Sequence, residues 1–304
     1  MTEAIYRETA DWRRSLEKAG RRMSVSGVLG ILGFSRSGYR AWLRHIPSKS
    51  ETRRREVKGE IRKIYDESGQ NYGAPKISVI LRRRGRRISE RTVGKYMRSM
   101  DMRAQWMRPW TATTRDSCFS SRLSNVLDRQ FNPPAPNACW CTDITYVWTA
   151  AGFVYLTSIM DLFSRKIVSW TLSRTLEARH VVDTVLKAQM RRDVTSPLVI
   201  HSDRGCQYVS EAYRKATERM RRSYSAKGCP WDNACIESFH SLIKREWLNR
   251  FRIVDFRQAY SLVFEYVETF YNTRRIHGHC DFVSPDDYEK NHIRKKKSMN
   301  EAAI

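Results

Sequence analysis

The first apolar pattern along the chain is helical. Apolar residues between Ser24 and Leu32 recur at three- and four-residue spacing. Gly33 follows as a break, and Ser35 can cap a second helix that runs through Leu43. Two helices around a glycine-containing turn form the outline of a helix-turn-helix. Any helical hairpin shares this outline, so the pattern alone does not indicate DNA binding.

A second helical block follows. We expect one helix over residues 51–67, another from Pro75, whose missing N–H suits a first helical turn, and a third from Ser89 to Met100. This block is a second helix-turn-helix candidate, with the third helix as its recognition helix. The basic residues that could contact DNA from its turn and recognition helix are Arg82, Arg83, Arg84, Arg86, Arg87, Arg91, Lys95 and Arg98. The alternative is a solvated run of charges.

Beyond residue 137 the pattern changes to short β-rich runs that alternate with helices. Strands are expected over 140–148, 153–160, 166–172, 198–201 and 222–226, and helices over 176–191, 210–222, 237–250 and 256–271. Three strands followed by alternating helices and strands make an α/β domain.

These patterns divide the chain into five parts. We expect an N-terminal helical segment over 1–48, a second helix-turn-helix-like domain over 49–107, a linker over 108–136, an α/β domain over 137–290 and a frayed basic tail over 291–304.

Charge changes this picture more than composition does. The 304 residues carry a formal net charge of +24, and residues 1–110 hold 27 Lys and Arg against 11 Asp and Glu. Such a surface attracts polyanions, of which nucleic acid is the commonest, although a ribosomal-type protein or a solubility feature would also be basic. The seven cysteines include no CxxC pair, which argues against a zinc knuckle or a disulfide framework and favours reduced thiols. No apolar run is long enough for a membrane helix.

Three acidic residues stand at informative places in the α/β domain. Asp143 lies inside the first apolar strand, Asp203 follows a later buried strand, and Glu237 opens a helix. Residues in these positions can converge at one edge of a sheet. Carboxylates that cluster repel one another unless cations neutralise them, and Mg²⁺ prefers such oxygen ligands. Two ions held together in this way would support phosphoryl transfer.

Each acid also has a structural explanation. Asp143 could be a hydrogen-bonded core residue, and Glu237 could simply favour a helix N-terminus. Asp161, Asp232 and Asp255 are rival acids, of which Asp232 better suits a turn, while Asn233 suits a helix cap.

Longer motifs in fixed order resemble a known family, the second-frame (OrfB) transposases of the IS-three-type bacterial insertion sequences. The resemblance covers residues 20–290. It rests on the segments Ser35–Leu43, Tyr72–Ile77, Trp140–Tyr146, Asp161–Trp170, His201–Tyr208, Gly228–Phe239, Tyr271–His277 and Ser284–Tyr288.

The resemblance implies an RNase H-like, retroviral integrase-type catalytic core behind an all-α helix-turn-helix region. Asp143, Asp203 and Glu237 fall on the three acids of its Asp-Asp-Glu site, which holds two Mg²⁺ ions that Mn²⁺ can replace. Lys244 falls on a basic residue that lies two helical turns past the Glu and could hold the DNA backbone. Asn233 and Gln207 fall on positions that would support the site.

The implied reaction is cleavage at the element ends followed by attack of the freed 3′-OH on target DNA. The implied partners are DNA, further copies of the chain and the first-frame (OrfA) protein, because no leucine-zipper pattern precedes Ser24. The implied place is the bacterial cytoplasm. A nuclease of the same fold and a catalytically impaired DNA-binding relative are the alternatives.

One departure from the family bears on activity. The family usually has thirty-five residues between the second Asp and the Glu, whereas thirty-three lie between Asp203 and Glu237. The difference falls around Met220–Tyr224, where it would tighten a turn or shorten a small edge strand.

Overall fold

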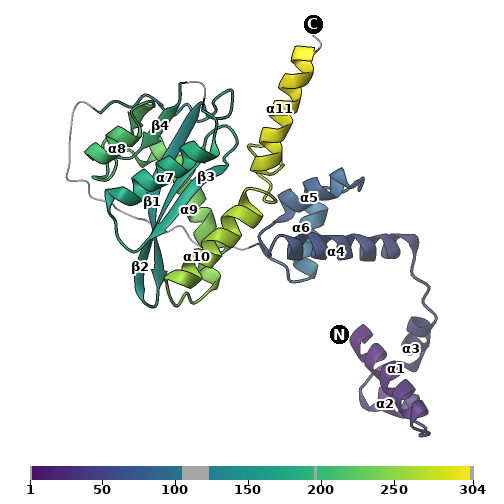
Figure 1. Cartoon of the computed structure of the whole chain (residues 1–304). Coiled ribbons are helices and arrows are strands. Elements are labelled where there is room, and N and C mark those ends of the chain that lie inside the picture. The colour runs from purple at the N-terminus through teal and green to yellow at the C-terminus, as the bar shows by residue number, and fades with distance from the viewer. Residues whose placement is uncertain (1, 105–122, 195–196, 302–304) are drawn as a thin grey trace. The chain divides into compact units, whose positions relative to one another are not determined.

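The computed structural model describes residues 2–104, 123–194 and 197–301 (Figure 1). The chain forms two compact units, Met1–Arg62 and Lys63–Ile304. Much of the linker predicted over 108–136 lies outside the described residues, as does Cys118. The proposed five-part division therefore stays a prediction.

The first unit is built from short helices around a small aromatic core. It contains α1 (Thr2–Lys18), α2 (Val25–Ile31), α3 (Arg36–Leu43) and the beginning of α4 (Lys49–Glu67). Buried Tyr6, Leu29 and Tyr39 hold α1, α2 and α3 together. Ser35 caps α3 as predicted, since its hydroxyl accepts a hydrogen bond from the N–H of Gly38.

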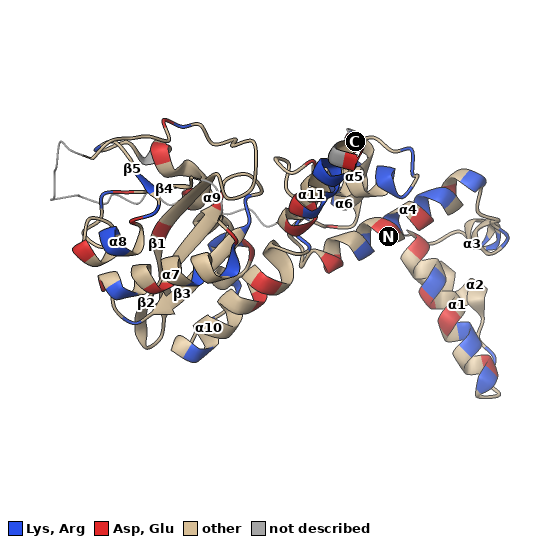
Figure 2. Cartoon of the chain, turned by 45° about the horizontal axis from the view of Figure 1, so that its top comes forward, with Lys and Arg blue, Asp and Glu red and all other residues tan. Residues whose placement is uncertain are grey.

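The second unit begins with the end of α4, followed by α5 (Ala74–Arg83) and α6 (Glu90–Ser99). Buried Ile77, Leu81 and Val93 form the contact between α5 and α6, and Ser89 caps α6 as predicted. Basic positions recur along α4 (Figure 2).

A five-stranded mixed sheet lies at the centre of the second unit. Its strands are β1 (Cys139–Thr149), β2 (Gly152–Asp161), β3 (Ile167–Ser173), β4 (Val199–Ser202) and β5 (Arg221–Tyr224). Their order is β3-β2-β1-β4-β5. The first three pair antiparallel, as a meander, while β4 pairs parallel to β1 and β5 pairs parallel to β4. This is the arrangement of an RNase H-like fold.

Helices cover both faces of the sheet. On one face, α7 (Ala178–Arg191) and the short α8 (Glu211–Ala216) pack on a core that includes Trp140, Ile159 and Val185 (Figure 1). On the other face, α9 (Ala234–Glu246) packs on β1 and β2. Side chains alternate along a strand, so Trp140 faces α7 and odd-numbered residues of β1 face α9.

The remaining elements follow α9 or lead into it. They are the 3-10 turns η1 (Pro230–Asn233) and η2 (Leu248–Arg250), α10 (Phe256–Phe264), the π-helical η3 (Glu265–Tyr271) and α11 (Pro285–Glu301). The prediction of a frayed basic tail over 291–304 was wrong up to Glu301, because α11 continues as a helix to that residue. None of the described helices is long and apolar enough to cross a membrane.

Within the second unit, the helices before residue 104 dock on the α/β domain through polar contacts. The Arg250 guanidinium donates to the carbonyl of Gly69, and the Tyr72 hydroxyl accepts the N–H of Ile276 at 3.0 Å. Arg83 donates to the carbonyls of Asp281 and Phe282. These contacts fix α5 and α6 beside the end of α9.

Candidate active site

Asp143 lies in the middle of β1, on the face that α9 covers. It pairs in register with Ser158 of β2, and its side chain is only 19% exposed. His240 of α9 approaches both residues, with its Nδ1 at 3.3 Å from Asp143 Oδ2 and its Nε2 at 3.4 Å from Ser158 Oγ. The carboxylate therefore points toward α9 and has a hydrogen-bonding neighbour there. The sequence missed His240 because its partners lie about a hundred residues away.

Asp203 follows the last residue of β4, where the chain turns away from the sheet. Its Oδ1 accepts a hydrogen bond from the N–H of Gly205 at 2.9 Å. A Cβ on Gly205 would come within 3.1 Å of that oxygen and of Gln207 Oε1, so a glycine fits this tight turn. Gln207 itself donates to the carbonyl of Leu176. Parallel pairing of β1 with β4 places Asp203 at the same edge of the sheet toward which β1 carries Asp143.

Glu237 lies in the first turn of α9, on its exposed side. Partial burial raises the pKa of Glu237, and the negative charges of Asp143 and Asp203 raise it further. The charges of Asp143 on β1 and Asp203 at the end of β4 thus act on Glu237 of α9. Their joint role as metal ligands stays a prediction.

A buried tyrosine lies against the two aspartates. Tyr208 is 1% exposed, and its hydroxyl is 3.4 Å from the hydroxyl of Thr142. Burial and the charges of Asp143 and Asp203 hold the pKa of Tyr208 well above its usual value. Its hydroxyl therefore stays protonated and available as a donor between β1 and the Asp203 turn. Tyr208 ends the motif His201–Tyr208, but nothing in the sequence indicated its contact with Thr142.

Lys244 lies two helical turns after Glu237, near the same acids. Its Nζ donates to the hydroxyl of Thr145, two residues along β1 from Asp143, at 2.7 Å. Burial lowers the pKa of Lys244, while the negative charge of Asp143 opposes that change. The Lys244 side chain is thus held beside β1, close to Asp143.

The acids suit a hard divalent cation by their chemistry. All three donors are carboxylate oxygens, and a bound cation would relieve the repulsion that raises the pKa of Glu237. Among the described residues, no three His, Cys, Asp or Glu side chains lie close enough to form a complete metal-binding group. The three carboxylates therefore offer suitable oxygen ligands, but they are not yet arranged around one common point.

Comparison with known proteins identifies this architecture. Models described as "Integrase core domain" match residues 133–229 and 218–285, and one described as "HTH-like domain" matches 52–110. The transposase of insertion sequence element IS904 from Lactococcus lactis is 35% identical over 247 residues, which are 80% of this chain and 97% of that protein. Transposase InsF of IS3A from Escherichia coli is 31% identical over 282 residues, 91% of this chain and 98% of that one. The chain belongs to the transposases of IS3-type insertion sequences.

Its matches make the transposase a polynucleotidyl transferase that binds DNA. Among solved structures, the catalytic core domain of HTLV-2 integrase in complex with magnesium has a TM-score of 0.37 and 16% identity. That alignment covers 47% of the transposase and 92% of the integrase domain.

The rival acids of the transposase have structural roles. Buried Asp161 accepts the N–H groups of Asn137 and Phe163; burial raises its pKa to about 6. Asp255 caps α10 by accepting the N–H of Gln258. Asp232 holds the turn before α9, as its position in the sequence suggested.

Asn233 corrects one prediction. It occupies the N-cap position of α9, but its side chain makes no capping hydrogen bond. Its Nδ2 instead donates to the carbonyl of Thr142 at 3.2 Å. The predicted cap therefore ties the start of α9 to β1, directly beside Asp143.

The interval between Asp203 and Glu237 contains α8, a turn, β5 and η1. The helix predicted over 210–222 ends at Ala216, and a turn leads into β5 at Arg221. All four residues of β5 pair with β4, so the edge strand is retained. Because the strands run parallel, the start of β5 lies at the end of β4 opposite to Asp203. The turn before β5 is thus remote from the acids.

The predicted DNA-contacting residues fall into two groups. Arg83 donates to carbonyls of the α/β domain, and Arg84 forms an ion pair with Glu67 at 3.6 Å, so both have structural partners. Arg82 donates to the Ser78 hydroxyl. The exposed members on and before α6 are Arg87, Arg91, Lys95 and Arg98, while Arg86 is half-buried.

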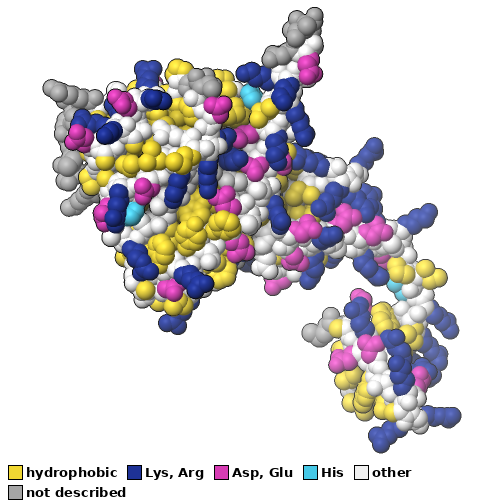
Figure 3. Space-filling view, viewed as in Figure 1, with side chains coloured by type: hydrophobic (Ala, Val, Ile, Leu, Met, Phe, Trp, Pro, Cys, Tyr) yellow, Lys and Arg dark blue, Asp and Glu magenta, His cyan; other side chains and the backbone are white. Residues whose placement is uncertain are grey.

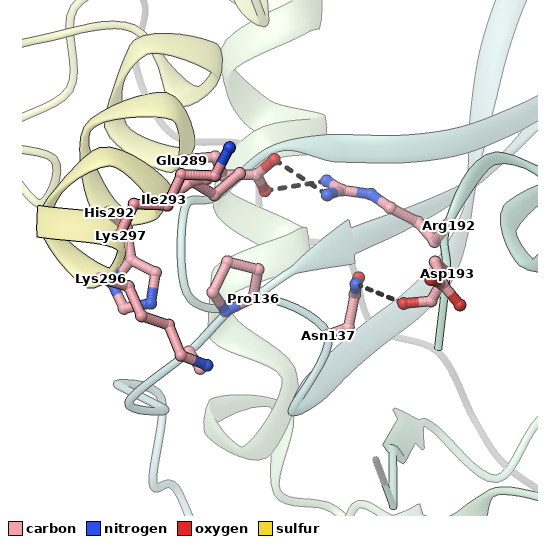
Figure 4. A pocket seen from close by; sticks show the side chains of 10 residues that line it. Pro136, Asn137, Arg192, Asp193, Glu289, His292, Ile293, Lys296 and Lys297 are labelled. Atoms are coloured by element: carbon pink, nitrogen blue, oxygen red, sulfur yellow. Dashed lines mark hydrogen bonds and ion pairs between the residues drawn. The ribbon is translucent and has the colours of Figure 1, made fainter. Parts of the chain in front are cut away.

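A cavity of about 480 Å³ lies apart from the acids, between α11 and the start of β1 (Figure 4). Arg192 forms a two-bond ion pair with Glu289 of α11, at 2.8 and 2.9 Å, beside this cavity. Lys296 and Lys297 line its outer side. The ion pair between Arg192 and Glu289 attaches α11 to the sheet domain. We therefore interpret the cavity as a gap in this contact.

Proposed function

We propose that the transposase cuts DNA at the ends of its insertion sequence and joins the freed 3′-OH to target DNA, with Asp143, Asp203 and Glu237 as metal ligands. The observation that carries the proposal is the sheet register, which brings Asp143 of β1 and Asp203 at the end of β4 to the same edge, with Glu237 in the first turn of the helix that packs on β1. The rival acids Asp161 and Asp232 are buried and hold turns of the fold.

The chemistry consists of two phosphoryl transfers. In the first, a water oxygen bonds to phosphorus at the element end and the P–O3′ bond breaks, which leaves a 3′-OH and a 5′-phosphate. In the second, that 3′ oxygen attacks a target phosphodiester and displaces the target's own 3′ oxygen. Bound divalent cations, two Mg²⁺ or Mn²⁺ in our proposal, supply charge neutralisation and activation of the attacking oxygen.

The protein's own groups bind and orient the substrate. Asp143, Asp203 and Glu237 would hold the cations, and His240 keeps the Asp143 carboxylate directed at α9. Lys244, held beside β1, would contact a phosphate next to the cut. Arg82, Arg83, Arg84, Arg86, Arg87, Arg91, Lys95 and Arg98 form our proposed DNA-contacting set.

Within that set, the exposed residues of α6 are the best supported. Arg91, Lys95 and Arg98 all lie on the solvent side of the helix, whereas Val93 and Met97 face the core. A recognition helix presents its polar side to the groove in this manner. Arg83 and Arg84 would have to exchange their present partners to reach a phosphate.

We further propose that the transposase acts as an oligomer, together with a first-frame partner, on DNA in the bacterial cytoplasm. Side chains on α7 and α10 leave apolar surface open to solvent, with Met190 86% and Phe264 48% exposed (Figure 3). Exposed apolar patches often mark association surfaces. Two element ends held by two copies would place both cuts in one complex.

The test is a cleavage and joining assay on DNA that carries the native element ends, with Mg²⁺, with and without the first-frame protein. Asp143→Asn, Asp203→Asn and Glu237→Gln should each lower strand transfer about a thousandfold or more, because each removes a charged ligand at the reacting centre. DNA retention in a gel-shift assay should stay nearly unchanged. Glu218→Gln, an exposed acid in the turn before β5, is the matched control and should retain full activity.

Strand transfer that survives any one of the three substitutions would refute the site. Metal-dependent cutting without joining would instead favour a nuclease. DNA retention with neither reaction would favour a DNA-binding relative without catalysis.

A further inference from the structure

The loop that leads into α9 exposes a tryptophan. Trp231 lies in η1 and is 70% exposed, although a tryptophan side chain is apolar enough that proteins usually bury most of it. It takes part in no ring contact with the described residues. The indole face is therefore open to a partner.

The backbone that carries this ring is fixed on its C-terminal side. Asp232, the next residue, is 2% exposed and accepts hydrogen bonds from the N–H of Ala226 at 2.8 Å and from Arg129 Nε at 2.7 Å. Asn125 donates to the same carboxylate at 3.0 Å. Asn233, one residue further, is 3% exposed and bonded to β1. A mobile surface loop would lack these anchors, so Trp231 is presented by a braced turn.

The turn that carries Trp231 is attached to the strand that carries Asp143. Asn233 donates to the carbonyl of Thr142, the neighbour of Asp143. Glu237 follows Trp231 by six residues in the first turn of α9. The exposed indole of Trp231 is thus carried by a segment that is bonded to β1 on its C-terminal side and leads directly into the helix of Glu237.

We propose that Trp231 is a stacking platform for an unpaired nucleobase beside the cut, an inference that rests on the proposed function. Every base has a π-face, and base–aromatic stacking tolerates any sequence. An unpaired base is the easiest to displace, and unstacking it costs only a few kcal/mol. The stacked base would hold the 3′ end in line with the acids.

The chain offers a matched control. Trp148, on the hairpin between β1 and β2, is 65% exposed, close to the value for Trp231. Its ring, however, packs edge-on against Phe153 with the centroids 4.8 Å apart. It lies five residues along β1 from Asp143, toward the hairpin turn. Trp148 and Trp231 have similar exposed fractions but different positions. Comparing their alanine variants therefore separates an effect of the Trp231 position from a general loss of aromatic surface.

The experiment uses the full chain and an element-end DNA with an unpaired 2-aminopurine at the position next to the cut. Without metal, binding of the wild-type protein should quench this base by stacking. Trp231→Ala should abolish the quenching, while Trp231→Phe should keep most of it and Trp148→Ala all of it. With Mg²⁺, Trp231→Ala should slow cleavage about tenfold, which corresponds to about 1.4 kcal/mol. The salt dependence of binding should not change, since no charge is removed.

Quenching that persists in Trp231→Ala, or that is lost equally in Trp148→Ala, would overturn the proposal. So would a cleavage defect in Trp231→Ala that Trp231→Phe fails to rescue. The two readouts keep the inferences separate. A wild-type protein that neither quenches the base nor cuts the DNA would contradict the proposed function. A Trp231→Ala variant that cuts normally and still quenches the base would contradict the stacking platform alone.

Discussion

Two glutamates on the same helix have opposite environments. Glu237 lies in the first turn of α9 and Glu246 is its last residue. Burial and the neighbouring aspartates raise the pKa of Glu237. Burial would also raise the pKa of Glu246, but hydrogen bonds from Arg275 and Tyr266 and the charge of Arg275 outweigh it and lower that pKa. The helix thus carries an acid in a repulsive field at one end and a neutralised acid at the other.

The neutralised end is a buried polar network. Glu246 is 4% exposed and accepts two hydrogen bonds from Arg275, at 2.6 and 2.7 Å, and one from the Tyr266 hydroxyl at 2.8 Å. Lys76 of α5 adds a further positive charge nearby. Complete satisfaction of this kind is typical of a group that serves the fold. Unrelieved repulsion at the other end is typical of a group that serves chemistry.

The largest expected effect on stability is that of Glu246→Gln. The substitution leaves the buried Arg275 guanidinium without its counter-ion, and we expect a loss of about 3–5 kcal/mol in the free energy of unfolding. Urea unfolding followed by circular dichroism measures it. Glu237→Gln, the same change on the same helix, should not destabilise the protein. Equal losses in both variants would remove the distinction between the two ends.

A smaller effect is expected for Lys76→Met. Burial and the charge of Arg275 lower the pKa of Lys76 to about 7, against the opposing effect of Glu246. Between pH 7 and 10.5 the unfolded chain therefore binds a proton that the folded protein does not, so wild-type stability rises with pH in that window. We expect methionine to stabilise the protein by about 1–2 kcal/mol at pH 6. The advantage should shrink as the pH rises above 7, and a constant or growing advantage would contradict the assignment.

The smallest effect is the gain in stability of Glu237→Gln itself. A raised pKa means that ionised Glu237 disfavours the folded state above its ordinary pKa of 4.5. Because the residue is exposed, solvent screening limits the gain to a few tenths of a kcal/mol at neutral pH. The gain should vanish below pH 4.5 and decrease with added salt. Thermal melts at pH 4 and pH 7 compare the two variants, and a gain that survives at pH 4 would argue against a charge effect.

The sequence predicted the local elements well where their causes are local. The meander of β1, β2 and β3 follows from alternating apolar residues, and the capping roles of Ser35 and Ser89 follow from side-chain chemistry within three residues. The RNase H-like fold came from motif order. The assignment of the three acids also came from the motifs, and their catalytic role stays a prediction.

Long-range contacts could not be predicted in this way. The helix over 210–222 has suitable residues throughout, yet it ends at Ala216, where the guanidinium of Arg222 bonds to the carbonyls of Arg214 and Thr217. Asn233 has the chemistry of a cap but finds a partner on β1. The pair between Glu246 and Arg275 joins residues 29 positions apart, and no spacing pattern announces it.

The turn between α8 and β5 has a consequence for how such chains vary through time. Exposed Glu218 and Arg219 lie in this turn, at the end of β5 remote from Asp203. Residues gained or lost there change the count between two acids without changing the strand pairing that sets where each acid stands. The number of residues between Asp203 and Glu237 can therefore differ between related chains. The parallel register of β4 and β5 keeps the positions of the two acids the same.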